Sequence, residues 1–353
     1  MKHHYWEAPI VIYLFLGGLG GGIFFLSALF DLIIAPGSGP LFFAPVFFAL
    51  AALALGCFFL VFELGQPPVF WRVFTTKTAI IKWGAVLLSV AMIFGFVWWA
   101  SYLYVLGWEW TFGLAAALEG VRPIMLGVAG VAGFGVMVYT GVMLSTLKAH
   151  AFWATPALPV LFTVSALSTA CAAIALSLGG ALQLEGVALL LAELIHEIVH
   201  TVDIVLVVAE IVVLLVMVLS FYGAGNVCAH EVAARWVRGK TAPLFWGGMV
   251  FGGLLLPLCL YVFGAGTAAS ALVAPWLVLC GGLLLRVNDY QALGIKIARI
   301  EATARGGEQI AGKITVEAAT GTPQLNQGTT GTSVTVDCGS GANISSNGDL
   351  SKP

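Results

Sequence analysis

Apolar residues fall into eight long segments along this chain, separated by short polar stretches. A helix needs roughly 20 apolar residues to cross a bilayer, and each segment meets that length. We therefore predict eight transmembrane helices, at residues 9–35, 41–64, 79–105, 122–146, 156–178, 189–221, 243–265 and 267–287. The pattern predicts an all-α integral membrane domain over residues 1–290, with the first apolar segment retained as a span. Residues 291–353 are polar and form a tail, which we expect either to be flexible or to bind a partner subunit.

The sixth segment is apolar enough to span a membrane, yet it carries a row of ionisable side chains. At the 3,4 spacing of one helix face, this row contains Glu193, His196, His200, Asp203 and Glu210. An ionised side chain in lipid costs roughly 2.5–3.5 kcal/mol on insertion scales, so the face must contact protein or water. A polar face that joins helices is one explanation. The number of titratable groups favours a proton path or a redox-linked site.

The overall composition excludes an ordinary soluble domain. Hydrophobic residues make up 60% of the sequence and charged residues 9%, whereas soluble domains carry about a quarter charged residues. A net charge of −2 provides no basic surface for nucleic acid. The six cysteines are scattered without a C-x-x-C pair, so they predict neither an iron–sulfur site nor a zinc site.

Basic residues lie almost entirely on one side of the predicted spans. With eight spans both termini share this side, and Arg122 is on the opposite one. The positive-inside rule then places the termini in the cytoplasm, and we expect the protein in a prokaryotic inner membrane. Some of these basic residues would also suit docking of an acidic partner, namely Arg72, Lys77, Lys148, Arg235 and Arg238.

Several residues near the side that carries the termini suit a flat ligand. The first span contains the small-xxx-small pair Gly17 and Gly21, which lets a helix or a planar molecule approach the backbone closely. Tyr13 precedes the pair by one turn. Glu63 ends the second span, and Tyr139 lies roughly two turns from the end of the fourth. Helix packing explains such glycines equally well, and an interfacial charge explains Glu63.

Four stretches in order resemble the NrfD/PsrC-like family, the quinone-reactive membrane subunits of polysulfide-reductase-type complexes. They are WEAPIVIYLFLGGLGGG at 6–22, ELGQP at 63–67, YTGVMLSTLKAHAFWATPALPVLF at 139–162 and HTVDIVLVVAEIVVL at 200–214. The resemblance covers about residues 5–290. It implies two four-helix bundles that bind menaquinone or ubiquinone and hold no haem or metal of their own. It also implies a ferredoxin-like iron–sulfur partner and a further catalytic subunit, often one that contains molybdopterin.

The resemblance also implies roles for single residues. Tyr139 matches the family's quinone-contacting tyrosine in the fourth span, and Asp203 and Glu210 match acidic positions of the sixth. Tyr13 lies where some members have a quinone-binding histidine. We therefore expect Tyr13, Gly17, Gly21, Glu63 and Tyr139 to form the quinone site.

Two other functions are open from the residues alone. A b-haem cytochrome anchor needs axial histidines on facing helices, but the two histidines within spans share one helix. A proton-coupled secondary transporter needs helices broken near mid-membrane. The glycines of the first span and Pro257 of the seventh are weak versions of that signal. The sequence favours a quinone-binding subunit that exchanges protons through the sixth span.

Overall fold

The computed structural model describes most of the predicted membrane domain. Its described residues are 8–63, 80–107, 109–145, 157–179, 186–223, 233–234, 236–239, 241–264 and 266–288. The proposed docking residues Arg72, Lys77, Lys148 and Arg235 lie outside these ranges, as does the tail 291–353. The division into a membrane domain and a tail therefore stays a prediction.

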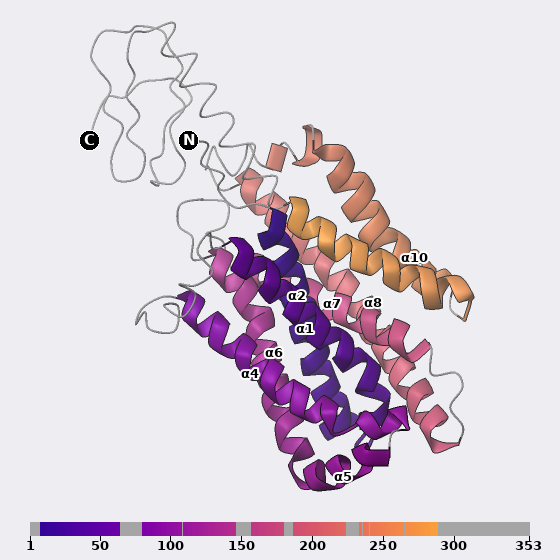
Figure 1. Ribbon diagram of the computed structural model, residues 1–353. Helices are drawn as coiled ribbons and strands as arrows, with labels where there is room; N and C mark the ends of the chain where they lie inside the picture. The colour runs from indigo at the N-terminus through magenta and orange to yellow at the C-terminus, as the bar shows by residue number, and fades with distance from the viewer. Residues whose placement is uncertain are drawn as a thin grey trace, which may run out of the picture.

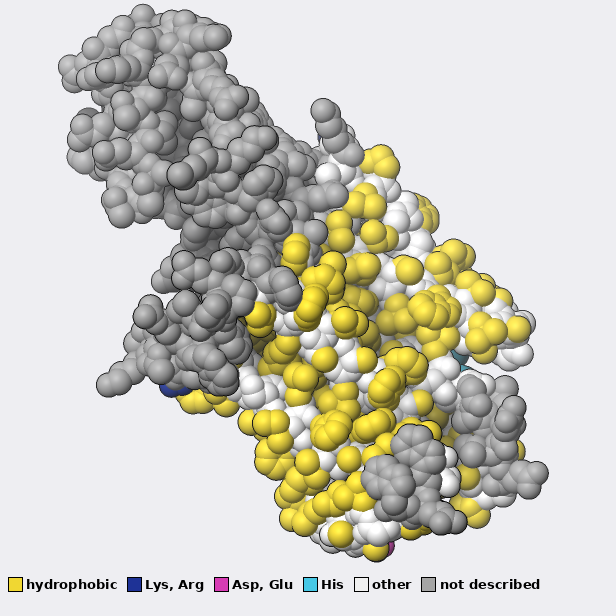
Figure 2. All heavy atoms as spheres, viewed as in Figure 1, with side chains coloured by type: hydrophobic (Ala, Val, Ile, Leu, Met, Phe, Trp, Pro, Cys, Tyr) yellow, Lys and Arg dark blue, Asp and Glu magenta, His cyan; other side chains and the backbone are white. Residues whose placement is uncertain are grey.

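The described residues contain eight helical segments long and apolar enough to cross a membrane, and they contain no strand. This confirms the predicted all-α membrane fold. The segments are Pro9–Ile34, Gly39–Val61, Lys82–Ala100, Thr111–Ser145, Ala157–Gly179, Val187–Gly223, Leu244–Phe263 and Ala269–Asn288. Figure 2 shows hydrophobic side chains spread across the whole described surface that faces the viewer, with only traces of charged side chains, as expected of a surface in contact with lipid.

The helices form two groups that meet along the first helix (Figure 1). The first group contains α1 (Ala8–Leu29), α2 (Phe43–Glu63), α4 (Ile80–Ala100) and α6 (Arg122–Ser145). The second contains α7 (Ala157–Gly179), α8 (Val187–Gly223), the paired segments η7 (Leu244–Leu255) and α10 (Leu256–Phe263), and residues 269–288. Helix α1 packs against α2, α6 and α7, and α6 also packs directly against α7, so both helices join the two groups.

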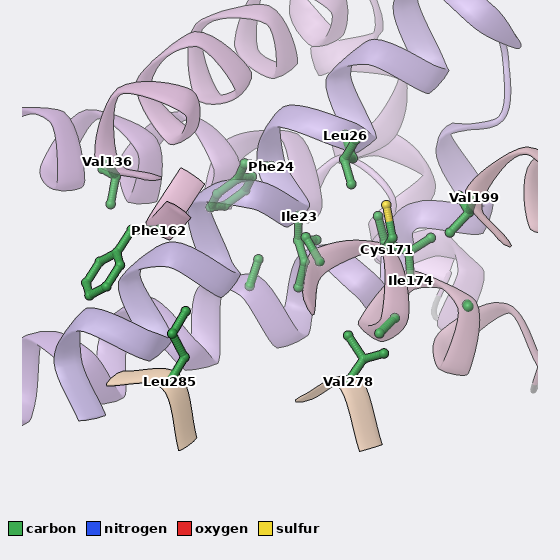
Figure 3. Packing of buried hydrophobic residues seen from close by; sticks show 14 of the residues in the cluster. Ile23, Phe24, Leu26, Val136, Phe162, Cys171, Ile174, Val199, Val278 and Leu285 are labelled. Atoms are coloured by element: carbon green, nitrogen blue, oxygen red, sulfur yellow. The ribbon is translucent and has the colours of Figure 1, made fainter. Parts of the chain in front are cut away.

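Glycines and small side chains explain how closely α1 fits between its neighbours. A Cβ on Gly21 would lie 2.5 Å from the carbonyl oxygen of Gly133 in α6. On the other side of α1, a Cβ on Gly22 would lie 2.8 Å from the Cβ of Ala170 in α7. Such small-residue contacts let membrane helices pack backbone to backbone. Figure 3 shows buried side chains of α1, including Ile23 and Phe24, meeting those of the other helices.

Two features of the spans differ from the sequence prediction. The fourth span is preceded by a separate helix, α5 (Glu109–Leu118), which joins it through a 3₁₀ turn. The seventh and eighth spans each begin as π-helix, at Leu244–Leu255 and at η8 (Ala269–Val273). Pro257 and Pro275 follow these segments by two residues. A proline ring clashes with the carbonyl four residues earlier, and the wider π turn relieves that clash.

Candidate functional site

The polar face of α8 turns toward protein over its central part. Asp203 is 1% exposed and Glu210 5%, while Val207 between them is also buried. His196 and His200 are half-buried, and Glu193 is exposed at the start of the row. Since lipid penalises ionised groups, burial of the two central carboxyl groups against other helices is expected, whether the face joins helices or exchanges protons. We call these five titratable residues the α8 row.

Asp203 accepts hydrogen bonds from two hydroxyl groups on different helices. Ser168 of α7 donates to one carboxylate oxygen at 2.6 Å, and the Tyr261 hydroxyl of α10 donates to the other at 2.8 Å. The ring of Tyr261 packs edge-on against His200, with ring centroids 4.6 Å apart. A hydrogen-bonded network across three helices therefore joins Ser168, Asp203 and Tyr261, and His200 packs against its Tyr261 end.

A pocket opens at the outer end of this network, where α10 ends and η8 begins. It is small, with room for about one water molecule, and is lined by His196, His200, Asp203 and Tyr261. Ser270 of η8 and Cys171 of α7 also line it, together with apolar residues such as Val199 and Pro275. Both imidazoles and the buried carboxyl group thus face one space. Within the described ranges, no group of three or more His, Cys, Asp or Glu side chains could hold a metal ion.

A buried cation from the last span lies beside Glu210, at the inner end of the α8 row. The sequence did not predict its burial. Arg286 is 2% exposed and donates to the Ser165 hydroxyl of α7 at 2.9 Å and to the Gly282 carbonyl at 2.7 Å. Ser165 also hydrogen-bonds the Glu210 carboxylate, which interacts electrostatically with Arg286. The predicted eighth span, 267–287, already contained Arg286, but an arginine next to a span end gives no sign of burial. In the structure this span ends at Asn288, and the Arg286 side chain is buried within the protein.

The first group of helices brings Tyr13 and Tyr139 together. They are 3% and 8% exposed, and their hydroxyl groups are close enough to interact electrostatically. The Tyr139 hydroxyl donates to the Met143 sulfur at 3.2 Å. Its ring lies directly on Gly84 of α4, where a Cβ would overlap it. Gly17 lies beside Tyr13, with 3.9 Å from its Cβ position to the Tyr13 ring.

The remaining predicted site residues occupy different places. Gly21 lies one turn deeper than Gly17, in the close contact with α6 rather than beside the tyrosines. Glu63 is the last residue of α2, and its side chain is outside the described part of the structure. Arg238 is exposed. Gly84 was not predicted as a site residue. A single glycine near the end of a span indicates nothing until its contact with the Tyr139 ring is known.

Comparison with known proteins agrees with this fold. The family described as Polysulphide reductase, NrfD matches residues 1–288. The sequence is 28% identical to the C subunit of the polysulfide reductase of Wolinella succinogenes over 275 residues, 73% of this sequence and 83% of that protein. It is also 28% identical to protein NrfD of Escherichia coli over 306 residues, 80% of this sequence and 92% of that protein. The motifs of the first, second, fourth and sixth spans therefore predicted the family correctly: the protein belongs to the polysulphide reductase NrfD family of integral membrane proteins.

Proposed function

We propose that this protein is the quinone-binding membrane subunit of a multi-subunit respiratory oxidoreductase. It exchanges electrons with an iron–sulfur partner and protons through the α8 row. The observation that carries the proposal is the pair of buried tyrosines between α1, α4 and α6. A polar pair inside a membrane bundle is expensive unless it has a function, and the two tyrosines lie in the halves of α1 and α6 nearer the terminus-bearing side.

The contacts of Tyr139 support a quinone as its ligand. A thioether sulfur is a weak hydrogen-bond acceptor, and within the described residues the Tyr139 hydroxyl donates to the Met143 sulfur. A quinone carbonyl oxygen is a stronger acceptor and would replace this contact with a net gain. The apolar side-chain atoms of Leu16, Val136 and Thr140 around Tyr13 and Gly17 would suit the apolar part of the ring. Menaquinone and ubiquinone share this chemistry.

The α8 row supplies the proton exchange that quinone chemistry requires. Oxidation of a quinol releases two electrons and two protons, and a charged intermediate in a low-dielectric site is costly. From His196 to Glu210 the row spans about 21 Å along the helix, at 1.5 Å per residue. Imidazole and carboxyl groups both exchange protons readily. We propose that protons enter at the pocket beside His196 and His200 and pass through Tyr261 and Asp203.

The relatives support the existence of partner subunits. One is the C subunit of a polysulfide reductase, a name that implies other subunits in that enzyme. We propose that this protein likewise assembles with a ferredoxin-like iron–sulfur subunit and a catalytic subunit, such as one that contains molybdopterin. Arg72, Lys77, Lys148, Arg235 and Arg238 would form the docking surface. We propose that this surface and both termini face the cytoplasm of a prokaryotic inner membrane, as the distribution of basic residues indicates.

This orientation predicts the outcome of labelling from one side. A cysteine introduced at Arg238 should react with a membrane-impermeant maleimide only after the membrane is opened, and one at Glu193 should react in intact spheroplasts. Both side chains are exposed, which makes them a matched pair. Native cysteines are first replaced by alanine. The reverse pattern would place the docking surface outside and contradict the proposed orientation.

The tyrosine pair predicts which substitutions weaken quinone binding. Tyr139→Phe removes one hydrogen bond and should weaken binding about fivefold, the effect of about 1 kcal/mol. Gly84→Ala should weaken it further, because the new methyl group overlaps the Tyr139 ring and displaces it. Binding is measured by titrating short-chain menaquinone and ubiquinone analogues into the purified protein and following tryptophan fluorescence.

Tyr104→Phe is the control for this experiment. Tyr104 is a half-buried tyrosine at the opposite end of the first group, where it packs against Tyr102 and Phe112. Its substitution should leave the affinity unchanged. If Tyr139→Phe and Gly84→Ala also bind both analogues like the control, the tyrosine pair is not the quinone site.

A further inference from the structure

We infer that two buried hydroxyl groups of α7, those of Ser165 and Ser168, carry protons past Val207, the apolar residue that interrupts the α8 row. The inference rests on the proposed proton role of the row, and it adds a second helix to that role. We call the connection through the two serines the α7 path.

The α8 row has one long gap. From Glu193 to Asp203 its neighbouring members are three or four residues apart, but Glu210 follows Asp203 by seven. Seven residues span about 10.5 Å of helix, whereas proton transfer needs a direct hydrogen bond or one bridging water. Val207 occupies the middle of this gap, is completely buried and has no polar side-chain atom. Protons that reach Asp203 therefore need groups from another helix to continue to Glu210.

Helix α7 supplies a hydroxyl group at each end of this gap. It lies beside α8 and runs in the opposite direction (Figure 1). Ser168 donates to Asp203 at 2.6 Å, and Ser165 hydrogen-bonds Glu210. Both serines are completely buried, and the three residues between their positions span only about 4.5 Å of α7. The two carboxyl groups are close enough to interact electrostatically, and α7 provides the shorter connection between them.

These two hydroxyls differ from others on the same helix. A serine or threonine inside a helix commonly donates to a carbonyl of the preceding turn. Thr163, Thr169 and Ser177 each donate to a carbonyl four residues earlier in α7. Ser165 and Ser168 instead bond side chains of other helices. Each therefore places an exchangeable proton against a buried carboxyl group.

A serine hydroxyl can relay a proton without acquiring a net charge, because it is both a donor and an acceptor. Side chains three residues apart on a helix are about 5–6 Å apart at their Cβ atoms, so one water molecule can bridge the two hydroxyls. At each hydroxyl one O–H bond forms and another breaks, and one proton passes in total from Asp203 to Glu210. Arg286 donates to the Ser165 oxygen at 2.9 Å, which directs the single proton of that hydroxyl toward Glu210.

Quinone reduction by the assembled complex in proteoliposomes, with a reduced viologen dye as the electron donor, tests the α7 path. Ser168→Ala should slow turnover about tenfold, less than the loss of a proton-exchanging acid or base, and should still bind the menaquinone analogue like the wild type. Its rate should also fall more in D₂O than the wild-type rate does, since proton movement then limits turnover. Ser177→Ala is the matched control, because the Ser177 hydroxyl donates within α7. It should keep wild-type turnover.

A hydroxyl at position 207 should restore proton movement, because it would fill the gap in the row itself. Val207→Thr exchanges a methyl group for a hydroxyl of similar size, on the helix face that carries both carboxyl groups. The double variant Ser168→Ala/Val207→Thr should therefore turn over faster than Ser168→Ala. A hydroxyl on α8 would not repair a packing defect in α7. If Ser168→Ala does not assemble, Ser168→Cys replaces it in both variants, since a thiol is of similar size but is only a weak donor.

The possible results separate the α7 path from the proposed function. Wild-type turnover in Ser168→Ala, a slowed Ser168→Ala without the larger D₂O effect, or a double variant that stays equally slow would overturn the α7 path. If Asp203→Asn is slow in the same assay, the proposed proton role of the row still stands. A wild-type complex that neither binds nor reduces quinone would remove the proposed function, and the α7 path with it.

Discussion

Asp203→Asn is expected to slow quinone-coupled electron transfer by about 100-fold, the typical contribution of a positioned acid or base. Asp203 is the carboxyl group at which the polar contacts of three helices meet, with Ser168 and Tyr261 each donating to it. Asparagine has nearly the same shape but only one acceptor oxygen and no exchangeable carboxyl proton. One of the two hydroxyl donors therefore loses its acceptor, and the relay loses its central group.

The measurement follows quinone reduction by the assembled complex in proteoliposomes, with a reduced viologen dye as the electron donor. Glu197→Gln is the matched control, because Glu197 belongs to the same helix but is exposed and lies outside the α8 row. It should keep wild-type turnover. Turnover of Asp203→Asn equal to that of the control, with quinone still bound, would show that Asp203 is only a structural link between α7, α8 and α10.

Gly21→Ala is expected to lower the free energy of unfolding by about 3 kcal/mol, at the upper end for overpacked cores. The added methyl group would lie 2.5 Å from the Gly133 carbonyl oxygen and 3.3 Å from the Met137 amide nitrogen. Both neighbours are backbone atoms, so a side-chain rotation cannot relieve the contact. Helices α1 and α6 must move apart, and the packing of Phe24 against α6 is lost with them.

Unfolding in detergent with increasing sodium dodecyl sulfate measures this effect. Gly113→Ala serves as the control, because a Cβ at Gly113 in α5 has no neighbour within 4 Å. Alanine favours helix over glycine by up to about 1 kcal/mol, so the control should be neutral or slightly more stable. A Gly21→Ala protein as stable as Gly113→Ala would mean that α1 and α6 pack less closely than described.

Hydrophobic segment length was enough to predict the fold. Every predicted span overlaps a helical segment of the structure, and the five titratable residues of the α8 row follow the 3.6-residue period of one helix face. The π-helical starts of the seventh and eighth spans were not predicted, although Pro257 and Pro275 mark them. Their hydrophobic pattern is uniform, so periodicity carries no information about helix type there.

Residues of the candidate sites could be predicted only where several ionisable residues fell on one membrane-spanning helix. Asp203 and Glu210 stood out because charged residues are rare inside a span. Tyr261 and Ser168 did not, because a tyrosine or serine in a membrane helix is ordinary. Their role depends on contacts between residues 35 and 58 positions apart, which no local pattern reveals.

The burial of Arg286 was not predicted for a different reason. An arginine at the end of an apolar run usually flanks the membrane, and only its contacts with another helix show that it is buried. Its contacts with Ser165 and Phe162 join residues more than 120 positions apart in the sequence. The four stretches that carry the family resemblance also do not include Arg286.

The central claim, that this protein is the quinone-binding subunit of an oxidoreductase complex, is tested most directly by gentle purification from native membranes. Copurifying subunits are identified by mass spectrometry, and bound lipids are extracted and analysed for quinone. We expect an iron–sulfur subunit and a stoichiometric amount of menaquinone or ubiquinone, with less quinone retained by the Tyr139→Phe and Gly84→Ala variants. A protein that purifies alone and without quinone would contradict the claim and would favour proton-coupled transport instead.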